Sequence, residues 1–197
     1  MQNRQMQKNA KKIGRWKENE ERRKKQGNRM VELKLDWNQI ESIDENLFRN
    51  NEKLITIHLQ GNKIQVIHPN TFIHLANLTT LHIFDNSIKN LDESTFKYNT
   101  KLEELGFGGN ELTVIAPKMF ENNVELKLLQ MSENHIQSIG IETFSNLPKL
   151  EYLSLGNNSL EIIQEELFIK NKNLEELQLI VSLYCKINCI YIKTKLN

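Results

Sequence analysis

LITIHLQGNKIQVIHPNTFIHLAN, residues 54–77, is the stretch that decides the fold. The next 24 residues, LTTLHIFDNSIKNLDESTFKYNTK (78–101), repeat its spacing of apolar residues, asparagine and phenylalanine. Six copies follow one another without insertion or deletion, and their asparagines are Asn38, Asn62, Asn86, Asn110, Asn134 and Asn158. Self-similarity at a fixed period of this length is typical of solenoids, in which each repeat forms one structural unit.

Apolar residues recur at fixed distances from each of these asparagines. In the second repeat they are Leu54, Ile57, Leu59, Ile64, Ile67 and Phe72. The apolar-x-apolar segment before the asparagine alternates as a strand does, with one side chain inward and the next outward. One repeat cannot bury its apolar face alone, so we expect neighbouring repeats to stack around a continuous core.

The pattern resembles the leucine-rich repeat, L-x-x-L-x-L-x-x-N-x-L, in its 24-residue form. The resemblance covers six full repeats, starting at 30, 54, 78, 102, 126 and 150, and a partial seventh starting at 174. It implies a leucine-rich-repeat solenoid, a curved horseshoe with short parallel strands on the concave face. Irregular turns or short helical turns are expected on the convex face, where the phenylalanines form a second layer.

The repeated asparagines are interpreted as turn residues whose side-chain amides bond backbone groups of neighbouring turns, forming a polar ladder inside the solenoid. A second position departs from the consensus, which expects leucine three residues after the phenylalanine. Leu75 and Leu147 comply, whereas the other repeats carry Asn51, Asn99, Asn123 and Asn171. We interpret this F-x-x-N form as a turn variant of the convex side.

Charge separates the N-terminus from the rest of the chain. Residues 1–29 hold eleven Lys and Arg against three Glu, a net charge of +8, and the remainder holds fifteen against twenty-two, a net of −7. We interpret 1–29 as a basic arm, either disordered or a short helix over 15–26, and 30–181 as the solenoid. Residues 182–197 are a non-repeat tail, and our hypothesis is that it stems from a truncated or misannotated gene product.

The termini carry few signals of compartment or cofactor. The N-terminus lacks an apolar core of about 7–15 residues, so as written it is not a secretory signal peptide. No apolar stretch approaches the roughly 18–20 residues of a membrane span. Cys185 and Cys189 lie in the tail without matching ligands, which makes a poor metal site. We expect neither a metal nor a cofactor.

The family resemblance places the outward strand residues on the concave face. Seven strands about 4.8 Å apart make a strip roughly 29 Å wide, enough for a protein epitope. Our candidate partner-binding residues are Trp37, His58, Gln60, His82, Phe84, Asp85, Glu104, Gln130, Glu133 and Tyr152. The aromatic residues are the expected anchors, although Trp37 has packing against a flank as an alternative. The acidic residues favour a basic or polar partner, and an ordinary solvated surface remains the alternative.

Other motifs give weaker hypotheses. His58 and His82 occupy the same column on adjacent strands, which gives the hypothesis that they share a metal or sense pH. A third metal ligand is missing from this column, because its next member is Gly106. Asn77 and Asn157 begin glycosylation sequons. The glycine-rich run 106–109 lies inside a repeat strand, so we reject it as a phosphate loop. The sequence shows no pairing of a nucleophile with a base, so it does not predict catalysis.

Together these features predict a protein-recognition module and no enzyme. The repeat type is similar to ectodomains of Toll-like and insect leucine-rich immune or adhesion proteins. That similarity implies an unknown protein ligand, a receptor-like or immune setting, and an extracellular or cell-surface location through a parent protein. Nucleic acid is not an expected partner of the concave face, and oligomers would form through the solenoid ends. The alternative is an intracellular scaffold whose basic arm contacts nucleic acid or acidic surfaces.

Overall fold

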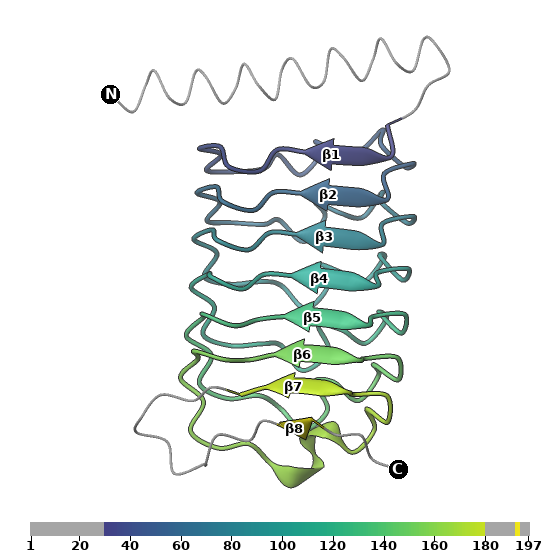
Figure 1. The fold of residues 1–197 in the computed structure, drawn as a ribbon. Coiled ribbons are helices and arrows are strands. Elements are labelled where there is room, and N and C mark those ends of the chain that lie inside the picture. Colours follow the sequence, from purple (N-terminus) through teal and green to yellow (C-terminus); the bar gives the residue numbers. More distant parts are fainter. Residues whose placement is uncertain (1–29, 180–191, 194–197) are drawn as a thin grey trace.

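Seven short parallel strands stacked in chain order form one sheet along the molecule (Figure 1). The computed structural model describes residues 30–179 and 192–193. The strands are β1 Glu32–Lys34, β2 Thr56–His58, β3 Thr80–His82, β4 Glu104–Gly106, β5 Leu128–Gln130, β6 Tyr152–Ser154 and β7 Glu176–Gln178. An eighth, β8 (Ile192–Lys193), pairs antiparallel with β7. The expected leucine-rich-repeat solenoid is therefore confirmed.

The strands pair in register, so that each residue lies beside the residue 24 positions further along the chain. Leu33 pairs with Ile57, and Ile57 pairs with Leu81. These central strand residues all point inward, and each is at most 2% exposed. Fully burying one such side chain contributes about 1.5–3 kcal/mol. Every repeat thereby adds the same set of side chains to one continuous core.

Phenylalanines form the second layer of this core, on the side away from the strands. The rings of Phe48 and Phe72 stack with centroids 6.0 Å apart, and those of Phe72 and Phe96 at 6.2 Å. Phe120 and Phe144 continue the stacking at 6.4 Å. Turns form most of the convex side, and one 3-10 helix, η1 (Glu165–Phe168), completes the sixth repeat. The expected phenylalanine layer is present.

Asparagine side chains link the turns that follow the strands. Asn110 is representative: its Nδ2 donates to the carbonyl oxygens of Ile83, Phe107 and Gly108 at 3.0–3.2 Å. Its Oδ1 accepts the backbone N–H of Ile88 at 3.0 Å. The same set of contacts recurs at Asn62, Asn86, Asn134 and Asn158. Each amide thus satisfies backbone groups that the core would otherwise bury without partners.

A second asparagine row accounts for the F-x-x-N variant in the third, fourth and sixth repeats, whereas Asn51 Nδ2 in the first repeat has no hydrogen-bond partner among the described residues. Asn99 Nδ2 donates to the carbonyl oxygens of Phe72 and Leu75 in the preceding repeat, both at 3.0 Å. Asn123 and Asn171 make the equivalent pair of bonds. A leucine at this position buries apolar surface but cannot donate. The asparagine therefore exchanges hydrophobic burial for two hydrogen bonds between neighbouring repeats.

Candidate functional site: the strand face

The strand face consists of the outward side chains of the seven strands and of the turn that follows each. Its side chains fall into four rows that run across the strands. The first two rows, set by the strand register, start at Glu32 and Lys34 and step by 24 residues. The third and fourth rows start at Asp36 and Trp37. Backbone bonds such as Trp37 N–H to Gln60 O, at 2.8 Å, extend the ladder to them.

Residues of the fourth row lie in a left-handed turn and not on the strands where the sequence placed them. The φ values are 51° at Trp37, 54° at Asp85, 56° at Glu133 and 52° at Asn157. Each strand ends four residues before the ladder asparagine, as β1 ends at Lys34 before Asn38. The left-handed turn between them directs the asparagine side chain to the backbone carbonyls of the turn. Left-handed backbone disfavours side chains with a Cβ. The two remaining members of the row are accordingly glycines, Gly61 and Gly109.

Glycines in the fourth row also make room for the preceding side chain. A Cβ on Gly61 would collide with the indole of Trp37, and one on Gly109 with the Oδ1 of Asp85. Trp37 therefore lies across Gly61, yet it remains 69% exposed. The indole thus packs against its neighbour in the fourth row and still presents most of its surface to solvent, and its role as a partner anchor stays a prediction.

Three aromatic side chains cluster at the C-terminal ends of β2 and β3. The rings of His58 and His82 meet edge to face with centroids 5.1 Å apart, and His82 contacts Phe84 at 5.5 Å. Gly106 allows this arrangement, because a Cβ there would approach Phe84 to 3.3 Å. The sequence predicted that His58 and His82 share a column, and the structure adds the contact of His82 with Phe84. Gly106 is a position whose importance sequence reasoning missed.

Each histidine of the cluster faces a carboxylate on an outer strand. His82 Nε2 lies 2.8 Å from Glu104 Oε1, and His58 Nε2 lies 3.5 Å from Glu32 Oε1. The two Nε2 atoms thus bind different carboxylates instead of sharing a ligand. Among residues 30–179, no group of three His, Cys, Asp or Glu side chains could hold a metal ion. A shared metal, one of the two roles weighed for this pair, has no support here.

Carboxylates dominate the charge of the strand face. Its described part holds six, against the single lysine Lys34, for a net charge of −5 with the histidines neutral: Glu32, Asp36, Asp85, Glu104, Glu133 and Glu176. Lys34 Nζ lies 3.0 Å from Glu32 Oε1. This hydrogen bond, helped by the charges of Lys34 and His58, holds the pKa of Glu32 below its ordinary value of 4.5. Lys34 is therefore already neutralised within the face.

The remaining candidates lie where the repeat register places them. Gln60 is half-buried beside Trp37, and Gln130 and Tyr152 are half-buried on β5 and β6. Asn77 lies away from the strand face, where its Nδ2 donates to the carbonyl of Glu52 at 2.9 Å and its Oδ1 accepts from Lys101. Asn157 is exposed at the end of the fourth row. Both sequons therefore remain predictions of glycosylation.

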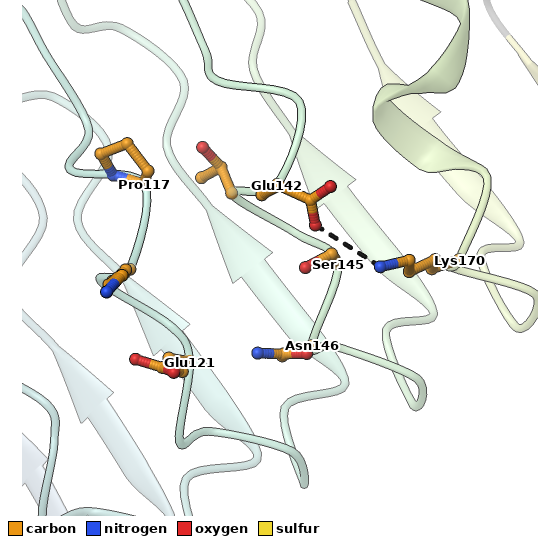
Figure 2. Close-up of a pocket in the computed structure, with 8 residues that line it drawn as sticks. Pro117, Glu121, Glu142, Ser145, Asn146 and Lys170 are labelled. Atoms are coloured by element: carbon orange, nitrogen blue, oxygen red, sulfur yellow. Dashed lines mark hydrogen bonds and ion pairs between the residues drawn. The ribbon is translucent and has the colours of Figure 1, made fainter.

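The side opposite the strands carries a pocket, which is a second candidate site (Figure 2). It has a volume of about 220 Å³ and is lined by Pro117, Lys118, Glu121, Glu142, Thr143, Ser145, Asn146 and Lys170. An ion pair between Glu142 and Lys170, at 3.4 Å, crosses one end of it. Pockets that hold drug-sized ligands enclose about 300–1,000 Å³ and are mainly apolar. This one is smaller and polar, so the strand face is the stronger candidate site.

Membrane and phosphate-binding features are limited. The described residues contain no helix that is long and apolar enough to cross a membrane. The run 106–109 continues β4, and its Phe107 is buried in the core. It therefore forms part of the repeat and not a loop that could surround a phosphate. Cys185, Cys189 and the arm 1–29 lie outside the described residues.

Comparison with known proteins identifies the family of the repeat. The family profile described as Leucine rich repeat matches residues 28–88, 76–136 and 124–180. No curated protein matches the sequence. Solved structures with the same fold include the TLR13–ssRNA13 complex (28% identity, TM-score 0.70) and the APL1 leucine-rich repeat domain (27%, 0.67). An internalin, InlF of Listeria monocytogenes, matches at 28% identity with a TM-score of 0.63.

The match covers most of this chain but a smaller part of each relative. It covers 78% of this chain and 22% of the TLR13 chain, 77% and 38% for APL1, and 76% and 41% for the internalin. The chain thus spans less than half the length of these structures. Since the profile matches cover 28–180 almost continuously, repeat after repeat, the chain belongs to the leucine-rich repeat family.

Proposed function

We propose that this chain is a recognition module that binds a partner protein on its strand face. The observation that carries this proposal is the cluster of His58, His82 and Phe84, in which each histidine lies against a glutamate. The exposed Trp37 lies over Gly61 on the same face. Aromatic side chains at the centre of a surface and polar groups at its rim are the usual arrangement of protein interfaces. Leucine-rich repeat proteins generally act as binding modules and not as enzymes.

An immune, receptor or adhesion setting is the context that we propose for this binding. APL1, TLR13 and the internalin provide the comparison. The cell-surface location, also part of the proposal, rests on the resemblance of the repeat type to immune and adhesion ectodomains. The TLR13 structure is a complex with ssRNA13. A face with a net charge of −5 would repel a phosphate backbone, so we do not extend RNA binding to this chain.

The alternative function, an intracellular scaffold with a basic arm that contacts nucleic acid or acidic surfaces, depends on residues 1–29. These lie outside the described residues. No observation in 30–179 favours that function over partner recognition, so it stays a sequence-based prediction.

Site-specific photo-crosslinking tests the proposal directly. Benzoylphenylalanine replaces Phe84 in one full-length variant and Tyr98, half exposed on the convex side, in a matched variant. Both are incubated with extracts of the source tissue and irradiated. We expect a discrete cross-linked protein at position 84 and its absence at position 98. Equal labelling at both positions, or labelling only at 98, would contradict the proposal.

A further inference from the structure

Four of the six carboxylates of the strand face take part in no ion pair among the described residues. On the flanks, lysines pair with glutamates of the neighbouring repeat, as Lys127 does with Glu103 at 2.8 Å, which raises the pKa of that lysine. Within residues 30–179, Asp36, Asp85, Glu133 and Glu176 of the strand face take part in no ion pair. Elsewhere in 30–179 sixteen carboxylates are interspersed with eleven Lys and Arg, whereas the strand face sets six carboxylates against one lysine. The strand face therefore has the greater local excess of negative charge.

Three of these carboxylates lie in the turns that follow β1, β3 and β5. Asp36 is in the third row beside Trp37, and Asp85 and Glu133 are in the fourth row, where Gly61 and Gly109 alternate with larger residues. Strands about 4.8 Å apart place charges two repeats apart at intervals of roughly 9.6 Å. Trp37, adjacent to Asp36, begins the row with an exposed indole, and such a ring attracts cations over its face. We call Trp37, Asp36, Asp85 and Glu133 the anionic strip.

One segment of the same chain has the complementary charge. Residues 1–29 carry a net charge of +8 and end directly before Met30, which leads into β1. The strip starts in that first repeat and reaches β5 over roughly 19 Å, a distance that about six extended residues cover. A tethered segment reaches a local concentration in the millimolar range, which makes weak individual contacts sufficient for binding.

We propose that residues 1–29 bind the anionic strip of their own chain and so cover part of the strand face. A partner would then have to displace the arm, and its binding would strengthen as salt weakens the arm's contacts. The inference goes beyond partner recognition and needs no foreign protein for its test. Its failure would leave the proposed function unchanged.

Limited trypsin digestion of the full chain measures whether the arm is held. The rate of cleavage within 1–29 is followed by mass spectrometry at 50 mM and 500 mM NaCl, relative to a free peptide of residues 1–29. At low salt we expect cleavage about tenfold slower in the chain than in the peptide, because bound arm is cut only when it dissociates. The protection should disappear at high salt.

Matched variants identify the strip as the surface that holds the arm. Asp36→Asn, Asp85→Asn and Glu133→Gln together should abolish the protection. A control with the same charge change on the convex side, Glu93→Gln, Glu121→Gln and Glu166→Gln, should keep it. Equal cleavage of arm and peptide in the wild-type chain, or protection that survives in the strip variant, would overturn the proposal. Protection that rises with protein concentration would show that the arm binds the strip of a second copy, and would overturn the proposal that it binds its own chain.

Discussion

At the residue before each ladder asparagine, backbone conformation decides which side chains the strand face can carry. That residue has a positive φ in all six full repeats. The conformation costs roughly 1–2 kcal/mol for a residue with a Cβ, so four repeats tolerate this cost and two avoid it with glycine. In the fourth row, the side chains of Trp37 and Asp85 occupy the space that a Cβ on Gly61 or Gly109 would fill. Steric fit, and not charge alone, therefore positions the anionic strip.

Gly61→Ala should destabilise the protein by about 1–3 kcal/mol, measured by urea unfolding. The new Cβ would occupy left-handed backbone and collide with the Trp37 indole. Gly140→Ala is the matched control, because its Cβ would meet nothing closer than 3.5 Å and its φ is not positive. It should change stability by under about 0.5 kcal/mol. Similar losses in both variants would show that this conformational account is wrong.

Lys34→Gln should raise the pKa of Glu32 toward 4.5, followed by carboxyl NMR titration. The hydrogen bond from Lys34 is the main cause of the lowered pKa. Because the pKa is lowered in the folded state, this interaction stabilises the fold fully above 4.5 and is lost as the pH falls through the folded value. Lys63→Gln, remote from Glu32 in sequence and exposed, serves as the control. An unchanged titration in Lys34→Gln would contradict this assignment.

At the scale of the element, two asparagine rows hold consecutive turns together. The inner row satisfies four backbone groups per side chain, as at Asn110. The outer row, as at Asn123, makes two bonds through Nδ2 while its Oδ1 has no partner among the described residues. An unpartnered buried acceptor carries a desolvation cost of about 1–3 kcal/mol, which offsets part of the gain. The two rows should therefore differ in their contribution to stability.

Asn110→Ala should cost about 3 kcal/mol or more in urea unfolding, because it leaves several buried backbone groups without partners. Asn123→Leu should cost under about 1.5 kcal/mol, since it restores the consensus leucine and removes the unpartnered Oδ1. Equal losses, or a larger loss for Asn123→Leu, would contradict the expected difference between the two rows.

Much of the element-level architecture could be predicted from the sequence, because the period of 24 residues fixes which side chains share a column. The parallel strands, the core and the pairing of His58 with His82 all follow from that register. The left-handed turn at Trp37 could not be predicted, because residues as different as Trp and Asn occupy it. The role of Asn99 depends on carbonyl oxygens of the preceding repeat, which the sequence does not display.

At the scale of the whole molecule, the solenoid presents two different long surfaces. The strand face gathers aromatic side chains and six carboxylates against one lysine, whereas the opposite side carries turns (Figure 1) and a small polar pocket lined by Lys170 (Figure 2). Stacking of repeats in register makes the strand face continuous, which suits an extended protein surface. The candidate residues were predictable as outward positions, but their contacts across strands, such as Phe84 over Gly106, required the structure.

The dissociation constant of the partner cross-linked at position 84 is the most direct measurement of the central claim. It is determined for the wild-type chain, for Trp37→Ala and Phe84→Ala on the strand face, and for Tyr98→Ala on the convex side. If the strand face is the recognition surface, at least one face variant should weaken binding about 30-fold, the loss typical of an anchor worth roughly 2 kcal/mol, while Tyr98→Ala binds as wild type. Wild-type affinity in both face variants, with weakened binding in Tyr98→Ala, would contradict the account.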